Sequence, residues 1–310
     1  MNRCLSWIEN EILVTFLLLR SNASLSISQF YVLLFARMIA FPSDMTLTPR
    51  LLFDLSIAAM TYGYTIDIIN QTVSVEEDTI NKPYRPIPAG LLTLTQAKVR
   101  LFLSICLSPI IIGALSGPWT AFWIVCWIVW VAFCYVWPKP NSFFFRNAFS
   151  AVGHVILLRM MNEIVSSHFP HVDTRFDLDL ANAALAMITV HVQEFHDVDG
   201  DRKSGRQTLP LLLSERGVIV LRQVTAAIFI ISSGLFLSWG FSICPKGGLL
   251  DVHFLGLLMV AASLITAVRV TLGTPESKVW DENTYKFCYV SIFLFLDAYL
   301  VQLNGAVCQA

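Results

Sequence analysis

The sequence contains few charged residues. Only 14% of its 310 residues are charged and 55% are hydrophobic, whereas an average soluble domain carries roughly a quarter charged residues. The mean hydropathy of the chain is +0.64. These values argue against a soluble globular domain.

Two further absences exclude classes of function. The net charge of −1 provides neither a global basic field for binding nucleic acid nor an acidic tail. The seven cysteines are scattered and include no C-x-x-C pair that could hold zinc. Any charge that matters for function must therefore be local.

Long apolar runs dominate the rest of the sequence. A helix needs about 20 apolar residues to cross the hydrocarbon core of a membrane. Such runs lie at residues 12–40, 51–70, 99–115, 119–137, 144–165, 178–195, 218–241, 252–272 and 285–303. The first is interrupted by Arg20 and Asn22, so it is either one long span or an interfacial helix followed by a span. The sequence predicts an all-α integral membrane protein, with about nine transmembrane helices forming one domain over residues 1–310.

Only two connections are long and polar, residues 72–98 and 196–216, and they follow the second and sixth spans. Basic residues near helix ends concentrate on the cytosolic side of a membrane. Most of those in this chain fall in even-numbered connections, and the odd-numbered ones hold little more than Arg37, Arg50, Arg175 and Lys246. The bias predicts that both polar connections and the N-terminus face the cytosol. For a eukaryotic chain the endoplasmic reticulum is the expected membrane.

The first polar cluster occupies residues 70–88. If the second span continues as a helix, Asn70, Ser74 and Asp78 are spaced i, i+4, i+8 and share one face. An amide oxygen, a hydroxyl and a carboxylate form a hard-oxygen set, which suits Mg²⁺. Two cations, Lys82 and Arg85, follow this set.

The second polar cluster occupies residues 194–210. Glu194, Asp197 and Asp201 are spaced i, i+3, i+7 on one expected helical face, where three carboxylates repel each other unless a cation lies between them. Cations again follow, and such groups beside carboxylates fit a diphosphate bridged by metal ions. One charged loop is explained by solvation alone, but two similar clusters on the same side of the membrane favour a functional site.

These residues resemble a known family. The stretch 70–90 is similar to the first signature of the UbiA prenyltransferase superfamily, and the stretch 194–210 is similar to the second. The matching residues are Asp78, Asn81, Lys82, Arg85, Pro86, Ile87 and Gly90, then Asp197, Gly200, Asp201, Gly205, Thr208, Leu209 and Pro210. The resemblance implies nine transmembrane helices around a central cavity, two Mg²⁺ ions and a bound isoprenyl diphosphate, with the lipid bilayer as surroundings and no nucleic acid.

The chain departs from that family at two positions. Prenyl-transferring members usually carry aspartate where this chain has Ser74, and often where it has Gln71. The Asn-x-x-x-Ser-x-x-x-acid arrangement resembles the metal-binding trio of soluble class I terpene cyclases. The sequence is also similar to UbiA-type membrane terpene cyclases of fungi.

The expected function is a terpene cyclase of secondary metabolism that ionises farnesyl diphosphate with Mg²⁺ and forms a sesquiterpene hydrocarbon. The alternative is a prenyltransferase acting on an aromatic or other nucleophilic acceptor. A transporter is disfavoured, because both clusters lie at helix ends and not at interrupted helices near the midplane.

Residue roles follow from the same interpretation. The predicted metal ligands are Asn70, Ser74, Asp78, Glu194, Asp197 and Asp201. The predicted diphosphate contacts are Lys82, Arg85, Lys139, Arg146, Lys203 and Arg206, of which Arg85, Lys139 and Lys203 are the expected catalytic residues.

Other residues are expected to line or flank the cavity. Aromatic residues of the fourth and fifth spans could stabilise a carbocation through their faces, and Tyr62 and Tyr64 are better placed for this. Arg159, Asn162 and Asp297 lie at apparent membrane depth, so they should face the cavity or each other.

Overall fold

The computed structural model describes residues 2–20, 23, 27–40, 46–170, 176–245, 253–274 and 276–303. Every element within these ranges is helical, so the predicted all-α class is confirmed.

Seven helical segments in this part of the chain are long and apolar enough to cross a membrane. They are α4 (Pro49–Val73), α6 (Leu94–Ser116), α7 (Pro118–Tyr135), α8 (Phe143–His168), α12 (Glu215–Ile243), α13 (Phe254–Leu272) and the segment Lys278–Leu303. The last comprises α14 (Lys278–Asn283), the π-helical η2 (Thr284–Tyr289) and α15 (Val290–Leu303). The protein is therefore an integral, multi-pass membrane protein.

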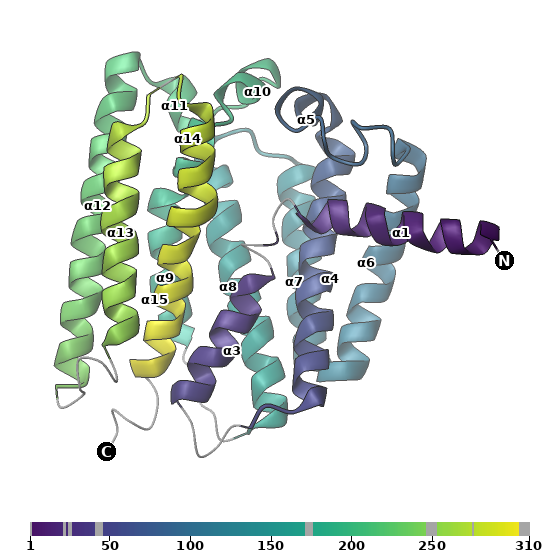
Figure 1. Cartoon of the computed structure of the whole chain (residues 1–310), viewed down its shortest axis with the longest axis horizontal. Coiled ribbons are helices and arrows are strands. Elements are labelled where there is room, and N and C mark those ends of the chain that lie inside the picture. Colours follow the sequence, from purple (N-terminus) through teal and green to yellow (C-terminus); the bar gives the residue numbers. More distant parts are fainter. Residues whose placement is uncertain are drawn as a thin grey trace.

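Two shorter helices run beside these seven in Figure 1, α3 (Ser28–Ala40) and α9 (Phe176–Thr189). They have 13 and 14 residues, fewer than the roughly 20 needed for a span. The helix α9 continues into a 3₁₀ turn, η1 (Val190–Phe195). The count of nine transmembrane helices thus stays a prediction.

The first expected span is divided between two helices. The N-terminal helix α1 (Asn2–Arg20) lies across the bundle, whereas α3 runs along it (Figure 1). Residues 21–22 and 24–26, inside that expected span, lie outside the described residues. The exposed apolar side chains Ile8, Ile12 and Phe16 recur every four residues and so share one face of α1.

Local sequence signals define the helix starts. Thr48 caps α4 by accepting a hydrogen bond from the Leu51 N–H at 3.1 Å, and Pro49 occupies the first turn, where its missing N–H costs nothing. Thr93 and Gln96 form a reciprocal capping box at the start of α6. These caps satisfy N–H groups that the first helical turn leaves unpaired.

The bundle has inner and outer helices. In the apolar windows of α4, α8 and the α14–α15 segment, 61% of residues are buried, compared with 17% in α6 and 28% in α12. One inner residue, Tyr299 of α15, packs against Gly240 of α12 and Gly256 of α13, where a Cβ atom would collide with its ring. Glycine at these two positions therefore lets three helices approach closely around one tyrosine.

Both polar connections fold at the same end of the bundle. The first forms α5 (Val75–Asn81), and the second forms α10 (Val198–Lys203) and α11 (Leu209–Leu212). The helix α5 packs against α10, and both lie at the top of Figure 1. The prediction that the two clusters lie on the same side is confirmed.

Candidate active site

A cavity of about 190 Å³ lies inside the bundle, and we call it the chamber. Residues from α3, α4, α5, α7, α8, α9–η1, η2 and α15 line it. Its mouth, at the end formed by the two polar connections, carries charged side chains, and its deep end is mainly aromatic and apolar. Typical ligand pockets measure about 300–1,000 Å³, so this chamber is small.

The first connection brings its three predicted metal ligands to different places. Ser74 interrupts the helix with φ −116° and ψ 28°. The Ser74 N–H still donates to the Asn70 carbonyl at 2.9 Å, and the Asp78 N–H donates to the Ser74 carbonyl at 2.9 Å. Asn70 lines the chamber, whereas the Ser74 hydroxyl accepts from Arg206 Nη2 at 3.3 Å.

Asp78 faces Arg85, a predicted diphosphate contact. Arg85 Nη1 donates to both carboxylate oxygens of Asp78 at 2.8 Å, and both side chains are buried. A buried carboxylate needs such a partner, because an unpaired charge away from water is strongly unfavourable. Arg85 also lines the chamber.

The second connection is not one continuous helix. The 3₁₀ turn η1 ends at Phe195 and α10 begins at Val198, so no single regular helix carries the three carboxylates. Arg146 nevertheless contacts both Glu194 and Asp201. Glu194 accepts from Arg146 Nε at 2.9 Å and from the Leu209 N–H at 3.2 Å. Asp201 accepts from Arg206 Nη1 at 3.2 Å.

Asp197 is the acid of the second connection that lines the chamber. Its Oδ2 atom lies 3.5 Å from Lys82 Nζ. Burial raises the pKa of Asp197, but the positive charges of Lys82, His196 and Arg146 outweigh this effect and lower it overall. Asp197 is therefore a carboxylate at neutral pH.

The predicted metal carboxylates and the predicted diphosphate cations thus pair with one another. The pairs are Asp78 with Arg85, Glu194 with Arg146, Asp197 with Lys82, and Asp201 with Arg206. Among the described residues, the Oδ1 atom of Asp197 and the Oδ2 atom of Asp201 are buried without a hydrogen-bond partner. These oxygens suit a hard cation, although no three His, Cys, Asp or Glu side chains converge on one point in the described ranges.

Glu77 belongs to this charge network although sequence reasoning did not select it. Its Oε1 atom accepts from Arg206 Nη1 at 2.6 Å, and its side chain is 7% exposed. Burial raises the pKa of Glu77 despite the opposing charge of Arg206. The acidic run Glu76-Glu77-Asp78 could have indicated Glu77, but the i, i+4, i+8 spacing that selected the predicted metal ligands excluded it.

A second pocket of about 670 Å³ adjoins the mouth, and we call it the side pocket. It shares Glu77, Arg146 and Arg206 with the chamber wall. Ser74, Lys139 and Lys203 line the side pocket but not the chamber, and both lysines are exposed. The predicted site residues are therefore divided between two adjoining spaces.

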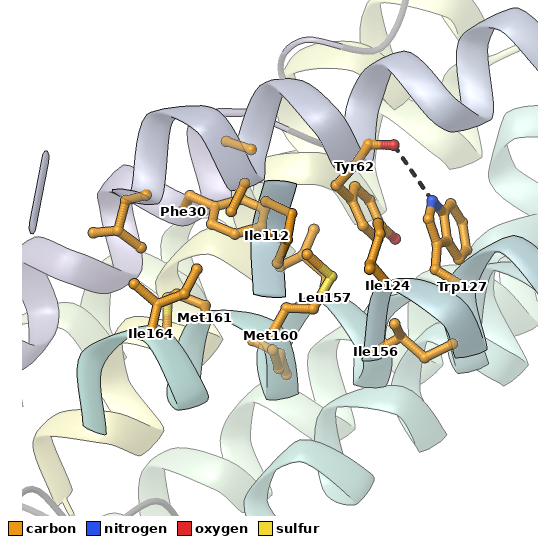
Figure 2. Close-up of a cluster of buried hydrophobic side chains, with 14 of the residues drawn as sticks. Phe30, Tyr62, Ile112, Ile124, Trp127, Ile156, Leu157, Met160, Met161 and Ile164 are labelled. Atoms are coloured by element: carbon orange, nitrogen blue, oxygen red, sulfur yellow. Dashed lines mark hydrogen bonds between the residues drawn. The ribbon is translucent and has the colours of Figure 1, made fainter. Parts of the chain in front are cut away.

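Aromatic side chains form much of the chamber wall. The ring of Tyr62 stacks on Trp127 with centroids 4.4 Å apart, and Trp127 Nε1 donates to the Tyr62 carbonyl at 3.3 Å, as Figure 2 shows. The Tyr62 hydroxyl donates to the Gly153 carbonyl at 2.9 Å. The expectation that Tyr62 lines the cavity is confirmed, but Tyr64 lines a groove on the other side of α4 beside Arg100.

The UbiA prenyltransferase family matches residues 30–282 of the chain. The chain belongs to this family. It is 32% identical to polyprenyl transferase eriF of Hericium erinaceus over 244 residues, covering 77% of this chain and 78% of that protein. It is 29% identical to diterpene cyclase eriG of the same fungus, covering 80% and 77%.

A solved structure supports the UbiA fold. The UbiA homolog from Archaeoglobus fulgidus bound to GPP and Mg²⁺ aligns with a TM-score of 0.57 at 13% identity, covering 93% of this chain and 99% of that one. The UbiA-like bundle around a central cavity is thus confirmed, and the protein is an enzyme of a family whose members include a transferase and a cyclase.

The three polar residues that the sequence places at membrane depth, Arg159, Asn162 and Asp297, fall into two groups. Arg159 Nη1 and Asn162 Nδ2 both donate to Asp179 Oδ2, at 3.3 and 3.4 Å. Asp297 contacts His154, which lines the chamber. Membrane depth singled out Asp297 in the sequence, but nothing in the sequence shows which helix supplies its partner.

Proposed function

We propose that this UbiA protein is a membrane terpene cyclase that ionises farnesyl diphosphate and closes the resulting cation to a sesquiterpene hydrocarbon. The observation that carries the proposal is one interior chamber with a charged mouth and an aromatic wall. Cations at the mouth suit a diphosphate, and aromatic faces tolerate positive charge deeper inside. The relationship to diterpene cyclase eriG supports this reaction class.

The mouth residues have separate tasks in this proposal. Asn70 and Asp197 would bind a metal ion inside the chamber. The remaining ligands of the two metal ions would be Asp78, Glu194, Asp201 and Ser74, which do not line the chamber. When bound, Mg²⁺ neutralises charge that develops on the diphosphate leaving group. The UbiA homolog bound to GPP and Mg²⁺ supports this assignment.

Four cations at the mouth are placed to bind the diphosphate, because Lys82, Arg85, Arg146 and Arg206 all line the chamber. Each now contacts a carboxylate, so substrate binding exchanges carboxylate partners for phosphate oxygens. Lys139 and Lys203 approach only from the side pocket. The expected order of importance therefore changes, with Arg85 ahead of both lysines.

The second candidate function is prenyl transfer. The side pocket shares part of the chamber wall, so an acceptor held there would lie next to the substrate's diphosphate end. The relationship to polyprenyl transferase eriF supports this alternative. Ser74 favours the cyclase, since prenyl-transferring members usually carry aspartate at that position.

The test is to incubate membranes containing the protein with farnesyl diphosphate and Mg²⁺, without an acceptor, and to analyse volatile hydrocarbons. A cyclic hydrocarbon that is absent from an Asp197→Ala control supports the cyclase. Only intact substrate or farnesol would favour the transferase. Geranylgeranyl diphosphate, assayed in parallel, tests the preferred chain length.

Ser74→Asp separates the two functions further. A new carboxylate there would compete with Glu77 and Asp201 for Arg206, whose Nη2 atom lies 3.3 Å from the Ser74 hydroxyl. A cyclase should lose most of its activity, whereas a transferase should tolerate the aspartate that its relatives carry.

The proposed location is the endoplasmic reticulum with the mouth facing the cytosol. Cys244 follows the end of α12 that lies opposite the mouth, and it is disulfide-bonded. Disulfides form in oxidising compartments such as the reticulum lumen. In sealed microsomes, a protease site inserted after Lys203 should be cleaved from outside; protection of that site would contradict the orientation.

A further inference from the structure

A histidine lies at the deep end of the chamber. His154 is on α8, eight residues after Arg146 at the mouth, which places it about 12 Å further along the helix. Its side chain is 7% exposed and lines the chamber. Its ring packs edge-on against Phe293 of α15, another chamber residue, with centroids 5.8 Å apart.

Both ring nitrogens of His154 have polar partners from other helices. Nε2 lies 3.2 Å from Oδ1 of Asp297 on α15, and Nδ1 lies 3.4 Å from Nε2 of Gln29 on α3. A carboxylate only accepts hydrogen bonds, so Asp297 fixes the proton of neutral His154 on Nε2. The lone pair is then on Nδ1.

The Gln29 amide suits both charge states of the ring. Its NH₂ group donates to the Nδ1 lone pair of neutral His154, and after an amide rotation its Oε1 atom accepts from a protonated Nδ1. Oε1 of Gln29 has no hydrogen-bond partner among the described residues. The Asp297 carboxylate, fully buried, stabilises the positive charge of an imidazolium.

His154, Asp297 and Gln29, which we call the triad, are polar groups whose burial inside an apolar bundle is energetically unfavourable. An intramembrane acid is unfavourable wherever apolar residues could pack instead, and such groups mark functional sites. Another buried acid, Asp179 of α9, is paired with Arg159 and is not among the residues that line the chamber. His154 is thus a basic side chain that the deep end presents to a ligand.

We propose that His154 is the catalytic base that ends cyclisation, an inference that rests on the proposed cyclase function. Ring closure transfers positive charge from the carbon that carried diphosphate, at the mouth, to a distal alkene carbon at the deep end. A C–H bond next to the cationic carbon breaks, and its electron pair forms the product double bond. The proton passes to Nδ1 of His154 once the Gln29 NH₂ group has moved away from the Nδ1 lone pair. Asp297 holds the imidazolium, and the proton leaves to water after the product departs.

The alternative base is the released diphosphate, which the residues of the mouth would hold; one of them, Arg146, lies about 12 Å along α8 from His154. A base at the mouth would remove protons near the first carbon of the chain. A base at His154 removes them near its distal end. The two bases therefore give different alkenes and respond to different substitutions.

The experiment compares His154→Asn with the wild-type protein in membranes supplied with farnesyl diphosphate and Mg²⁺. Diphosphate release measures ionisation, and hydrocarbon analysis measures termination. We expect diphosphate release within about threefold of wild type, while the main alkene is replaced by other alkenes and water-quenched alcohols. The matched control is His191→Asn, a buried histidine that hydrogen-bonds Thr225 at 2.7 Å and does not line the chamber; it should keep the wild-type product.

An unchanged product profile in His154→Asn would overturn the inference and leave the cyclase intact. Absence of any hydrocarbon from the wild-type protein would remove the proposed function and the inference together. If His154→Asn loses diphosphate release through misfolding, the product ratio of Asp297→Asn is measured instead. This variant keeps the shape of the triad and removes its negative charge. A shifted product ratio in Asp297→Asn supports the base, and a wild-type ratio rejects it.

Discussion

The two ends of the chamber are built differently. At the mouth, cations and carboxylates from distant segments pair directly, as Lys82 does with Asp197. At the deep end, the stacked rings of Tyr62 and Trp127 line the chamber together with one histidine, His154. Paired charges can exchange partners when a charged ligand arrives, whereas tightly packed rings keep their positions. The mouth is thus suited to starting a reaction and the deep end to directing it.

The largest effect should come from Asp197→Asn at the mouth. The change removes the chamber-lining acid and leaves Lys82 without its partner. Because metal-assisted charge stabilisation is worth several kcal/mol, diphosphate release should fall at least about 100-fold. Asp199→Asn is the matched control, since that side chain is 70% exposed. Equal activity of the two variants would show that the mouth does not work as proposed.

Arg206→Gln should give the next largest loss. Arg206 contacts Glu77, Asp201 and Ser74 in the wall between the chamber and the side pocket. Losing one charged donor should lower kcat for diphosphate release by about 100-fold. The matched control is Arg202→Gln, because the Arg202 side chain is 68% exposed. Its kcat should remain near the wild-type value. A similar small change in both variants would contradict a role for Arg206 in binding the leaving group.

Gly153→Ala tests the packing of the deep end. The added Cβ atom would lie 2.8 Å from Trp127 Cζ3, so the stacked Tyr62–Trp127 pair must shift. We expect a loss of about 1–3 kcal/mol in the free energy of unfolding and a changed alkene ratio with little change in diphosphate release. Gly234→Ala is the control, because its Cβ meets nothing within 4 Å. A wild-type product ratio in Gly153→Ala would mean that this wall does not shape the product.

The smallest effect should come from Lys203→Gln. Lys203 is exposed and lines only the side pocket, and an exposed ion pair is worth at most about 1 kcal/mol. KM should therefore rise no more than about fivefold with kcat unchanged. Lys82→Gln, inside the chamber, should be clearly worse. If Lys203→Gln lowered kcat as much as Asp197→Asn, diphosphate would have to occupy the side pocket.

Local patterns in the sequence predicted much of this arrangement. Apolar run lengths are local, so the helical class and most long helices followed from them. The two polar clusters were found because each occupies one stretch of chain. Their pairing was not predictable, because Glu77 meets Arg206 and Lys82 meets Asp197 across 129 and 115 residues.

Helix geometry explains one wrong prediction. Tyr62 and Tyr64 are two residues apart on α4, which turns by about 200° over that distance, so both could not face the chamber. The break at Ser74 was also missed, since nothing near it marks a helix end. His154 was not selected because a lone histidine in an apolar helix signals nothing until Asp297, 143 residues away, is placed beside it.

The crosswise helix α1 has a consequence for how substrate arrives. Its apolar row Ile8, Ile12 and Phe16 faces outward, while Glu11 pairs with Arg100 of α6. A helix with this profile lies in the plane of a leaflet and fixes how deeply a protein sits in the lipid. The proposed substrate, an isoprenyl diphosphate, is itself an amphiphile, so its approach through the same leaflet would be a search in two dimensions.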